Sequence, residues 1–214
     1  MKIFKQVFHD ITNINKKNIK LTIHKSAHRR KLLRWLYEVT RDFKYEQSTF
    51  GIAVYILDTY TQKYGFELNN YQLLGITSLF IAAKMEESKL KGINDYVQVT
   101  DCYVKEEEIL LMERHIINIH SFDIVTPHFY LKSWHLEKMS KKLSLAEKRE
   151  LLFSTFAYFL EMSTCKKSMY SIFLDGIKEA ENILAGHQIP KDLQFYINNN
   201  RITRHIKSRL VINK

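Results

Sequence analysis

The sequence predicts an all-α protein in which two helical bundles follow one another. Its 214 residues include only six glycines and two prolines, whereas sheet proteins need turn residues about every 8–12 positions. Apolar residues recur at helical spacing along most of the chain. The length suits two domains of about 100 residues each better than one. We therefore expect two five-helix bundles in tandem.

The first bundle is built around one very apolar segment. Leu73 to Ala83 leaves almost no polar side, so neighbouring helices must wrap this segment and it should form the central buried helix. Gly65 is a predicted stop for the preceding helix, and Asn69 or Asn70 could cap the central one. The helices predicted for this half span 27–44, 46–64, about 70–87, 93–102 and 105–121.

A boundary between the halves is predicted at 121–127. The Thr126-Pro127 step favours it, because proline disfavours helical geometry in the residue before it. We divide the chain into a lead-in segment over 1–26, a first domain over 27–124 and a second over 125–214. The helices predicted for the second domain span 127–140, 146–164, 168–185, 190–197 and 199–211.

The sequence lacks the common motifs of catalysis and of metal or cofactor binding. Phosphate-binding loops, zinc-protease helices and nucleophile elbows are absent. Cys102 and Cys165 lack paired spacing, and Ser163 with Lys166 match only a short pattern. We expect no catalytic residue, no metal and no cofactor. With no apolar stretch near the ~18 residues that span a bilayer, we expect an intracellular protein of the nucleus, the cytoplasm or both.

Three segments carry a family resemblance. The run 28–39, with Arg29, Trp35 and Glu38, resembles the opening helix of the cyclin box. The stretch 71–87 looks like the third helix of that box, and the stretch 108–124 is similar to its fifth helix and the Phe-Asp-Ile that follows. The chain thus resembles the cyclins in its first half, whereas the second half is similar only in architecture.

The resemblance implies a cyclin fold and a non-catalytic partner of a cyclin-dependent protein kinase, bound as a heterodimer. Lys84 and Glu113 would form the polar centre of the kinase-facing surface. From spacing alone, these two residues would be an ordinary exposed ion pair worth about 0–1 kcal/mol. The complete set of expected kinase-binding residues is Lys84, Met85, Glu86, Glu113, Phe122 and Ile124.

The resemblance also implies a candidate groove for substrate or inhibitor peptides of the Arg-x-Leu type. Its residues would be Arg29, Leu32, Trp35, Glu38 and Gln72. His28 and Lys31 replace the apolar Met and Ile of the family pattern. A lysine there should repel an arginine-bearing peptide. Residues 1–26 contain no arginine, so the Arg-x-x-Leu destruction signal of mitotic cyclins is not expected there.

Two other hypotheses stay open at this stage. General transcription factors of the TFIIB type reuse two cyclin folds to bind promoter DNA, and a net charge of +10 would suit phosphate contacts. However, the chain has no cysteine-rich zinc ribbon, and its basic residues form no single stripe, so nucleic acid is not the expected partner. A helical scaffold or viral-type mimic that binds a kinase outside cell-cycle control is the third hypothesis.

Overall fold

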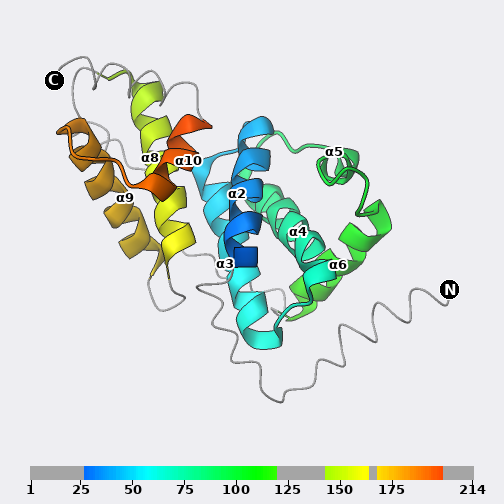
Figure 1. The fold of residues 1–214 in the computed structure, drawn as a ribbon. Helices are drawn as coiled ribbons and strands as arrows, with labels where there is room; N and C mark the ends of the chain where they lie inside the picture. Colours follow the sequence, from blue (N-terminus) through cyan, green and yellow to red (C-terminus); the bar gives the residue numbers. More distant parts are fainter. Residues whose placement is uncertain (1–26, 120–142, 164–167, 200–214) are drawn as a thin grey trace.

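The computed structural model describes residues 27–119, 143–163 and 168–199, and every regular element in these ranges is an α-helix (Figure 1). The all-α prediction is confirmed. The segment 1–26, the junction at 121–127, the helix over 127–140 and all but the first residue of the helix over 199–211 lie outside the described residues. The helices are α2 (Ala27–Asp42), α3 (Gln47–Tyr64), α4 (Leu68–Glu86), α5 (Ile93–Gln98), α6 (Glu106–Ile119), α8 (Leu145–Met162), α9 (Met169–Leu184) and α10 (Lys191–Asn198).

Helix α4 is the buried centre of the first bundle, as predicted. Every residue from Leu73 to Ala83 is buried, and α2, α3 and α6 all pack against α4. Gly75 lets α2 approach closely, because a Cβ at this position would lie 2.8 Å from Leu32 Cδ1. The stretch that lacks a polar side in the sequence is therefore the stretch that is enclosed on all sides.

Two details of the first bundle differ from the prediction. Helix α4 begins at Leu68 with Glu67 as its N-cap, so Asn69 and Asn70 lie inside the first turn and do not cap it. The short helix predicted over 93–102 ends at Gln98. The chain then turns, since Asp101 and Cys102 both take positive φ angles of 53° and 57°, which a continuing α-helix cannot include.

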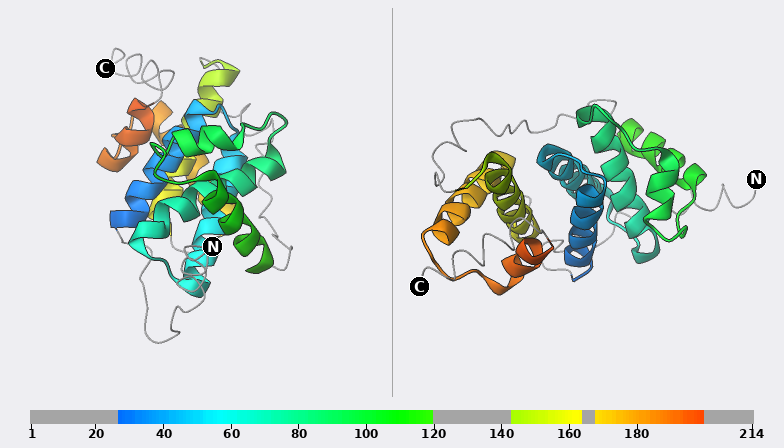
Figure 2. Two further views of the ribbon diagram at one scale, coloured as in Figure 1. Left: turned by 90° about the vertical axis from the view of Figure 1, so that its right-hand side faces the viewer. Right: turned by 90° about the horizontal axis from the view of Figure 1, so that it is seen from above.

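The two halves of the chain meet along α2 and α3. Seen from above, these helices lie between α4–α6 on one side and α8–α10 on the other (Figure 2). Tyr37 of α2 is fully buried at this junction, where its ring contacts Phe153 and Tyr196 edge to face with centroids 5.0 and 4.8 Å away. Its hydroxyl lies 3.2 Å from Ser154 Oγ. One continuous apolar core thus spans both halves.

Arg29 joins three helices through a single buried guanidinium group. Its side chain is 2% exposed and forms a two-pronged ion pair with Asp58 of α3, with N–O distances of 2.9 and 2.7 Å. It also donates to the carbonyl oxygens of Leu160 and Glu161 at the end of α8, at 3.3 and 3.0 Å. Both carbonyls lie at the negative end of α8, so the guanidinium brings them a charged donor, in addition to the Ser163 N–H and hydroxyl that Leu160 already accepts.

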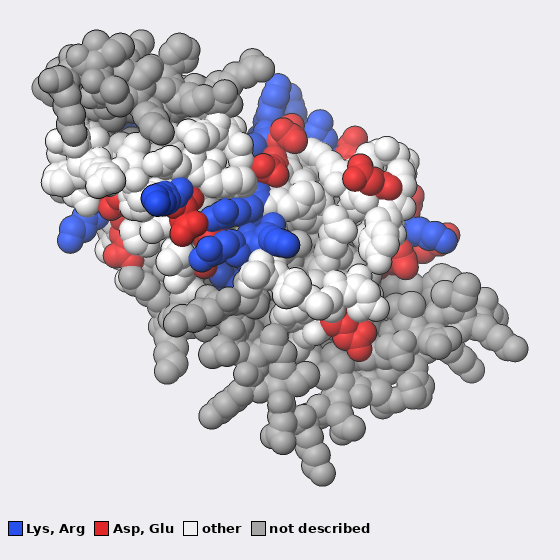
Figure 3. All heavy atoms as spheres, in the orientation of Figure 1, with Lys and Arg blue, Asp and Glu red and all other residues white. Residues whose placement is uncertain are grey.

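A second polar cluster surrounds the carboxylate of Glu161, which is 1% exposed. Arg30 and Arg34 each approach one of its oxygens to 2.9 Å, and the Tyr196 hydroxyl donates at 2.6 Å. Burial and this carboxylate raise the pKa of Tyr196 well above its usual value, so the phenol stays a donor. Figure 3, drawn in the orientation of Figure 1, shows Lys and Arg side chains gathered near the centre of the view, with Asp and Glu side chains beside them.

None of the helices in the described ranges is both long and apolar enough to cross a membrane.

Leu79→Asp should unfold the protein. Leu79 is fully buried in α4, and an unpaired carboxylate there would have to lose its hydration without compensation. Leu110→Asp is the matched control, because Leu110 is 43% exposed on α6. Thermal unfolding followed by circular dichroism should show a cooperative transition for the control alone. A native-like transition in Leu79→Asp would contradict the central position of α4.

Arg29→Ala should lower the free energy of unfolding by about 3–5 kcal/mol, the usual cost of removing one partner of a buried ion pair. The neighbouring Arg30 is 47% exposed, and its partner Glu161 keeps Arg34 and the Tyr196 hydroxyl when Arg30 is lost. Arg30→Ala should therefore cost about 1 kcal/mol or less. Urea denaturation of the two variants measures both values. Equal losses would show that Arg29 has no special part in joining the helices.

Candidate functional site

Lys84 and Glu113 lie together where the end of α4 meets the middle of α6. The Lys84 ammonium group donates to both carboxylate oxygens of Glu113, at 2.8 and 2.9 Å. It also lies 4.1 Å from the centroid of the Phe80 ring, within cation–π range. The Lys84 side chain is 41% exposed and that of Glu113 13%. The structure thus brings the expected polar pair together at the surface and holds the lysine from two directions.

Apolar side chains surround this pair and face outward. Met85 and Leu110 are 45% and 43% exposed, although residues of this type are usually buried. A hollow of about 280 Å³ opens beside Glu113 on the outer face of α6. It is lined by Leu110, Glu113, Arg114, Ile117 and Asn118.

The two acidic residues that end α4 have different roles. Glu86 is exposed. The carboxylate of Glu87 turns back to the start of α3, where it accepts hydrogen bonds from the Glu46 amide at 2.8 Å and from the Thr49 hydroxyl. Glu87 therefore supplies the cap that α3 lacks from its own N-cap side chain. Of the pair, only Glu86 is available to a partner.

His115, two residues after Glu113 on α6, packs toward α3 and does not line the hollow. Its ring packs against Tyr60 with centroids 5.9 Å apart, and burial lowers the pKa of its imidazole below the ordinary value. The charges that α6 presents around the hollow are therefore those of Glu113 and Arg114.

The residues expected to form a peptide groove on α2 are only partly available. Arg29 is occupied by Asp58 and by the end of α8, and Leu32 is 7% exposed beneath Gly75. The structure therefore places both in the interior, where they offer nothing for a peptide to contact. Sequence matching could not reveal this, because the partners of Arg29 lie far along the chain.

The other three groove residues remain at or near the surface. Trp35 and Gln72 are partly buried, and Trp35 packs against the core. Glu38 accepts a hydrogen bond of 3.0 Å from the Asn199 side chain. Desolvation and the nearby Asp42 raise the pKa of the Glu38 carboxyl. Glu38 is thus already bonded to Asn199 in the second half of the chain and is not free to bind a peptide through that oxygen.

Phe122 and Ile124, the remaining two residues expected to bind a kinase, lie outside the described residues.

Comparison with known proteins agrees with this architecture. Residues 3–125 match the model of the family described as "Cyclin, N-terminal domain", which is more than half of the chain. A solved structure of a viral cyclin from herpesvirus saimiri superimposes with a TM-score of 0.64 at 18% identity, covering 98% of this chain and 95% of that one. At this identity the likeness shows the fold alone. The predicted cyclin fold is confirmed.

Curated relatives match over about two thirds of the chain. The G2/mitotic-specific cyclin-B1 of Caenorhabditis elegans is 34% identical over 137 residues, which is 64% of this chain and 37% of that protein. The G2/mitotic-specific cyclin-A1 of the same organism is 30% identical over 62% of this chain and 26% of that protein. The G2/mitotic-specific cyclin-A of Drosophila melanogaster is 28% identical over 73% and 31%. The match therefore spans about a quarter to a third of each relative's length.

Proposed function

The chain belongs to the cyclin family, and from this premise we propose that it binds a cyclin-dependent Ser/Thr protein kinase as a heterodimer and activates it in cell-cycle control. The observation that carries this proposal is the Lys84–Glu113 pair, held at the surface within an apolar surround. The relatives described are cyclins A and B, which supports this hypothesis over promoter binding.

The polar pair is suited to recognise the backbone of an incoming helix. An ammonium group has three donors, and two of those on Lys84 are used by Glu113. The third is available to a carbonyl oxygen of the partner. The unused lone pairs of the Glu113 carboxylate can accept from a backbone amide. Because Phe80 and Glu113 already hold Lys84, little side-chain entropy remains to be lost on binding.

The apolar surround would supply most of the binding free energy. Met85 and Leu110 expose surface that a partner can remove from water, and the 280 Å³ hollow on α6 can hold an aliphatic side chain. Methionine adapts its shape to its neighbours at such surfaces. Glu86 and Arg114 lie at the rim, where charges favour correct orientation more than affinity.

Activation follows if this surface prefers one position of the kinase's regulatory helix. That helix carries the glutamate that must pair with the lysine holding the ATP phosphates. Moving it from 1:99 to 99:1 in favour of the active position requires a preference of about 5.5 kcal/mol. An interface of ordinary size, about 1,600 Å², can provide this. In this proposal the chain positions the kinase's regulatory helix and supplies no catalytic group. It acts wherever its kinase is found, in the nucleus or the cytoplasm.

The α2 face supports Arg-x-Leu peptide docking less well. Lys31 and His28 are exposed there, and a lysine disfavours an arginine-bearing ligand. With Arg29 and Leu32 enclosed, Trp35 and Gln72 remain as the surface that a substrate or inhibitor peptide could contact. We propose that any peptide bound there is selected by apolar contact with Trp35 rather than by an arginine.

Lys84→Glu should abolish kinase activation and leave the fold intact. The substitution places a carboxylate against Glu113, so two like charges would face the partner, and activation should fall by at least about tenfold. The exposed pair contributes only about 0–1 kcal/mol to folding. The assay is capture of a panel of purified cyclin-dependent kinases, followed by phosphorylation of histone and polymerase-tail substrates.

Lys178→Glu provides the matched control, because Lys178 is exposed on α9 and the charge change is the same. It should activate like the wild-type chain. Adding Glu113→Lys to Lys84→Glu restores an ion pair of opposite polarity and should recover part of the binding. Full activation by Lys84→Glu alone would remove the proposed interface.

A further inference from the structure

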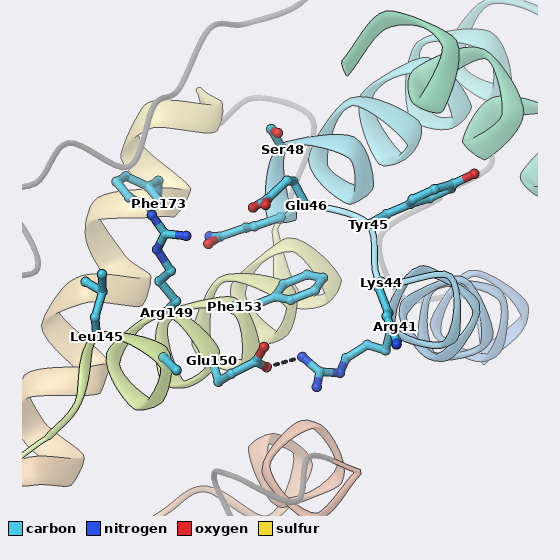
Figure 4. Close-up of a pocket in the computed structure, with 12 residues that line it drawn as sticks. Arg41, Lys44, Tyr45, Glu46, Ser48, Leu145, Arg149, Glu150, Phe153 and Phe173 are labelled. Atoms are coloured by element: carbon cyan, nitrogen blue, oxygen red, sulfur yellow. Dashed lines mark hydrogen bonds and ion pairs between the residues drawn. The ribbon is translucent and has the colours of Figure 1, made fainter. Parts of the chain in front are cut away.

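The lysine of helix α2 differs from the four arginines of the same helix. Carboxylates of other helices pair with all four arginines, which are Arg29, Arg30, Arg34 and Arg41. For Arg41 the partner is Glu150 of α8, as the dashed line in Figure 4 marks. Lys31 is exposed and forms no hydrogen bond or ion pair within the described part of the chain. Its charge is therefore available to a partner.

Lys31 belongs to an exposed ridge of α2 that also contains His28 and Trp35. Residues three and four positions apart are neighbours on one face of a helix, with Cβ atoms about 5–6 Å apart, so these three side chains follow one another along α2. His28 is exposed and has no hydrogen-bond partner among the described residues, and Trp35 is partly buried. This α2 ridge thus places an ammonium group and an imidazole N–H beside a large apolar ring.

Helix α4 adds apolar surface next to the ridge. Leu32 of α2 packs on Gly75, so α2 meets the face of α4 that carries this glycine. Gln72 and Leu68 lie one and two turns before Gly75 on that face. Leu68 is 60% exposed. An apolar side chain of a partner therefore finds exposed apolar surface on both helices.

The charge on the exposed face of α2 changes sign along the helix. Residues 27–37 contain four Lys and Arg residues and no acidic one, whereas Glu38 and Asp42 are acidic and exposed. The first turn also lacks an acidic residue, although the positive end of the helix dipole favours one. A carboxylate supplied by a partner is therefore favoured beside His28 and Lys31 and disfavoured beside Glu38.

From these observations we infer that the α2 ridge docks an acidic segment of a partner protein, with an apolar side chain against Trp35 and a carboxylate against Lys31. An extended chain advances about 3.3 Å per residue, so the two side chains lie two positions apart in such a segment. One unpaired lysine with Glu38 nearby suits a single carboxylate better than a run of nucleic-acid phosphates. The inference rests on the docking surface proposed above for α2 and is independent of kinase binding.

The test is capture of peptides by the immobilised full chain at low salt, counted by mass spectrometry. All peptides share a central leucine and random uncharged flanks. They carry Asp, Asn or Lys two positions before the leucine in one series and two positions after it in the other. One series should be retained in the order Asp, Asn, Lys, with about fivefold between the extremes. The other should lack this order, because its variable residue lies toward Glu38.

Lys31→Glu should reverse the order, and it should stay folded because Lys31 is exposed and unpaired in the described ranges. Lys178→Glu is the matched control, since it makes the same charge change on α9, and it should keep the wild-type order. Trp35→Leu should lower the capture of every peptide, while leucine keeps apolar packing against the core. Circular dichroism of each variant checks the fold.

An Asp preference that survives in folded Lys31→Glu would overturn the inference, because another basic part of the chain would then be responsible. Equal capture of Asp and Lys peptides that is lost in Trp35→Leu would also overturn it, but would leave Trp35 as a docking surface. Capture that does not depend on Trp35 would remove that surface as well. Kinase activation is measured separately through Lys84→Glu, so its failure is distinguishable from each of these results.

Discussion

The need to satisfy one buried guanidinium group organises this molecule. Arg29 can be enclosed only if each side of its fork finds an acceptor, and Asp58 and the last carbonyls of α8 provide them. This requirement places α2 and α3 side by side and brings the end of α8 against both. Helix α4 then packs on α2 and α3, and its last turn carries Lys84 to the surface.

Two acidic residues, Glu87 and Glu161, also hold helices together. Glu87 caps α3 from the end of α4, so the start of one helix is tied to the end of another close to the Lys84–Glu113 pair. Glu161 gathers Arg30, Arg34 and Tyr196, which holds α10 against α2. The proposed kinase surface is thus supported by a polar group, the Glu87 carboxylate, that itself turns inward.

The sequence predicts the features that depend on short local motifs and on the periodic spacing of apolar residues. The enclosure of α4, the stop at Gly65 and the meeting of Lys84 with Glu113 follow from apolar spacing and from the family pattern. The bond from Arg29 to Glu161 joins residues 132 positions apart, and no periodic signal marks such a pair. Ser144 and Glu147 carry a further local signal, since they follow the S-x-x-E pattern and their reciprocal capping box begins α8. Asn69 and Asn70 are residue types that favour the N-cap position, but the helix begins earlier, at Leu68, with Glu67 as its N-cap.

The central claim is that the end of α4 and the outer face of α6 form the surface that receives the kinase. Amide hydrogen exchange of the full chain, free and bound to a cyclin-dependent kinase, tests it most directly. The account predicts that binding slows exchange at residues 84–87 and along 106–119, while α9 exchanges at the same rate in both states. Protection confined to α2 or α9, with α6 unchanged in the complex, would contradict the account.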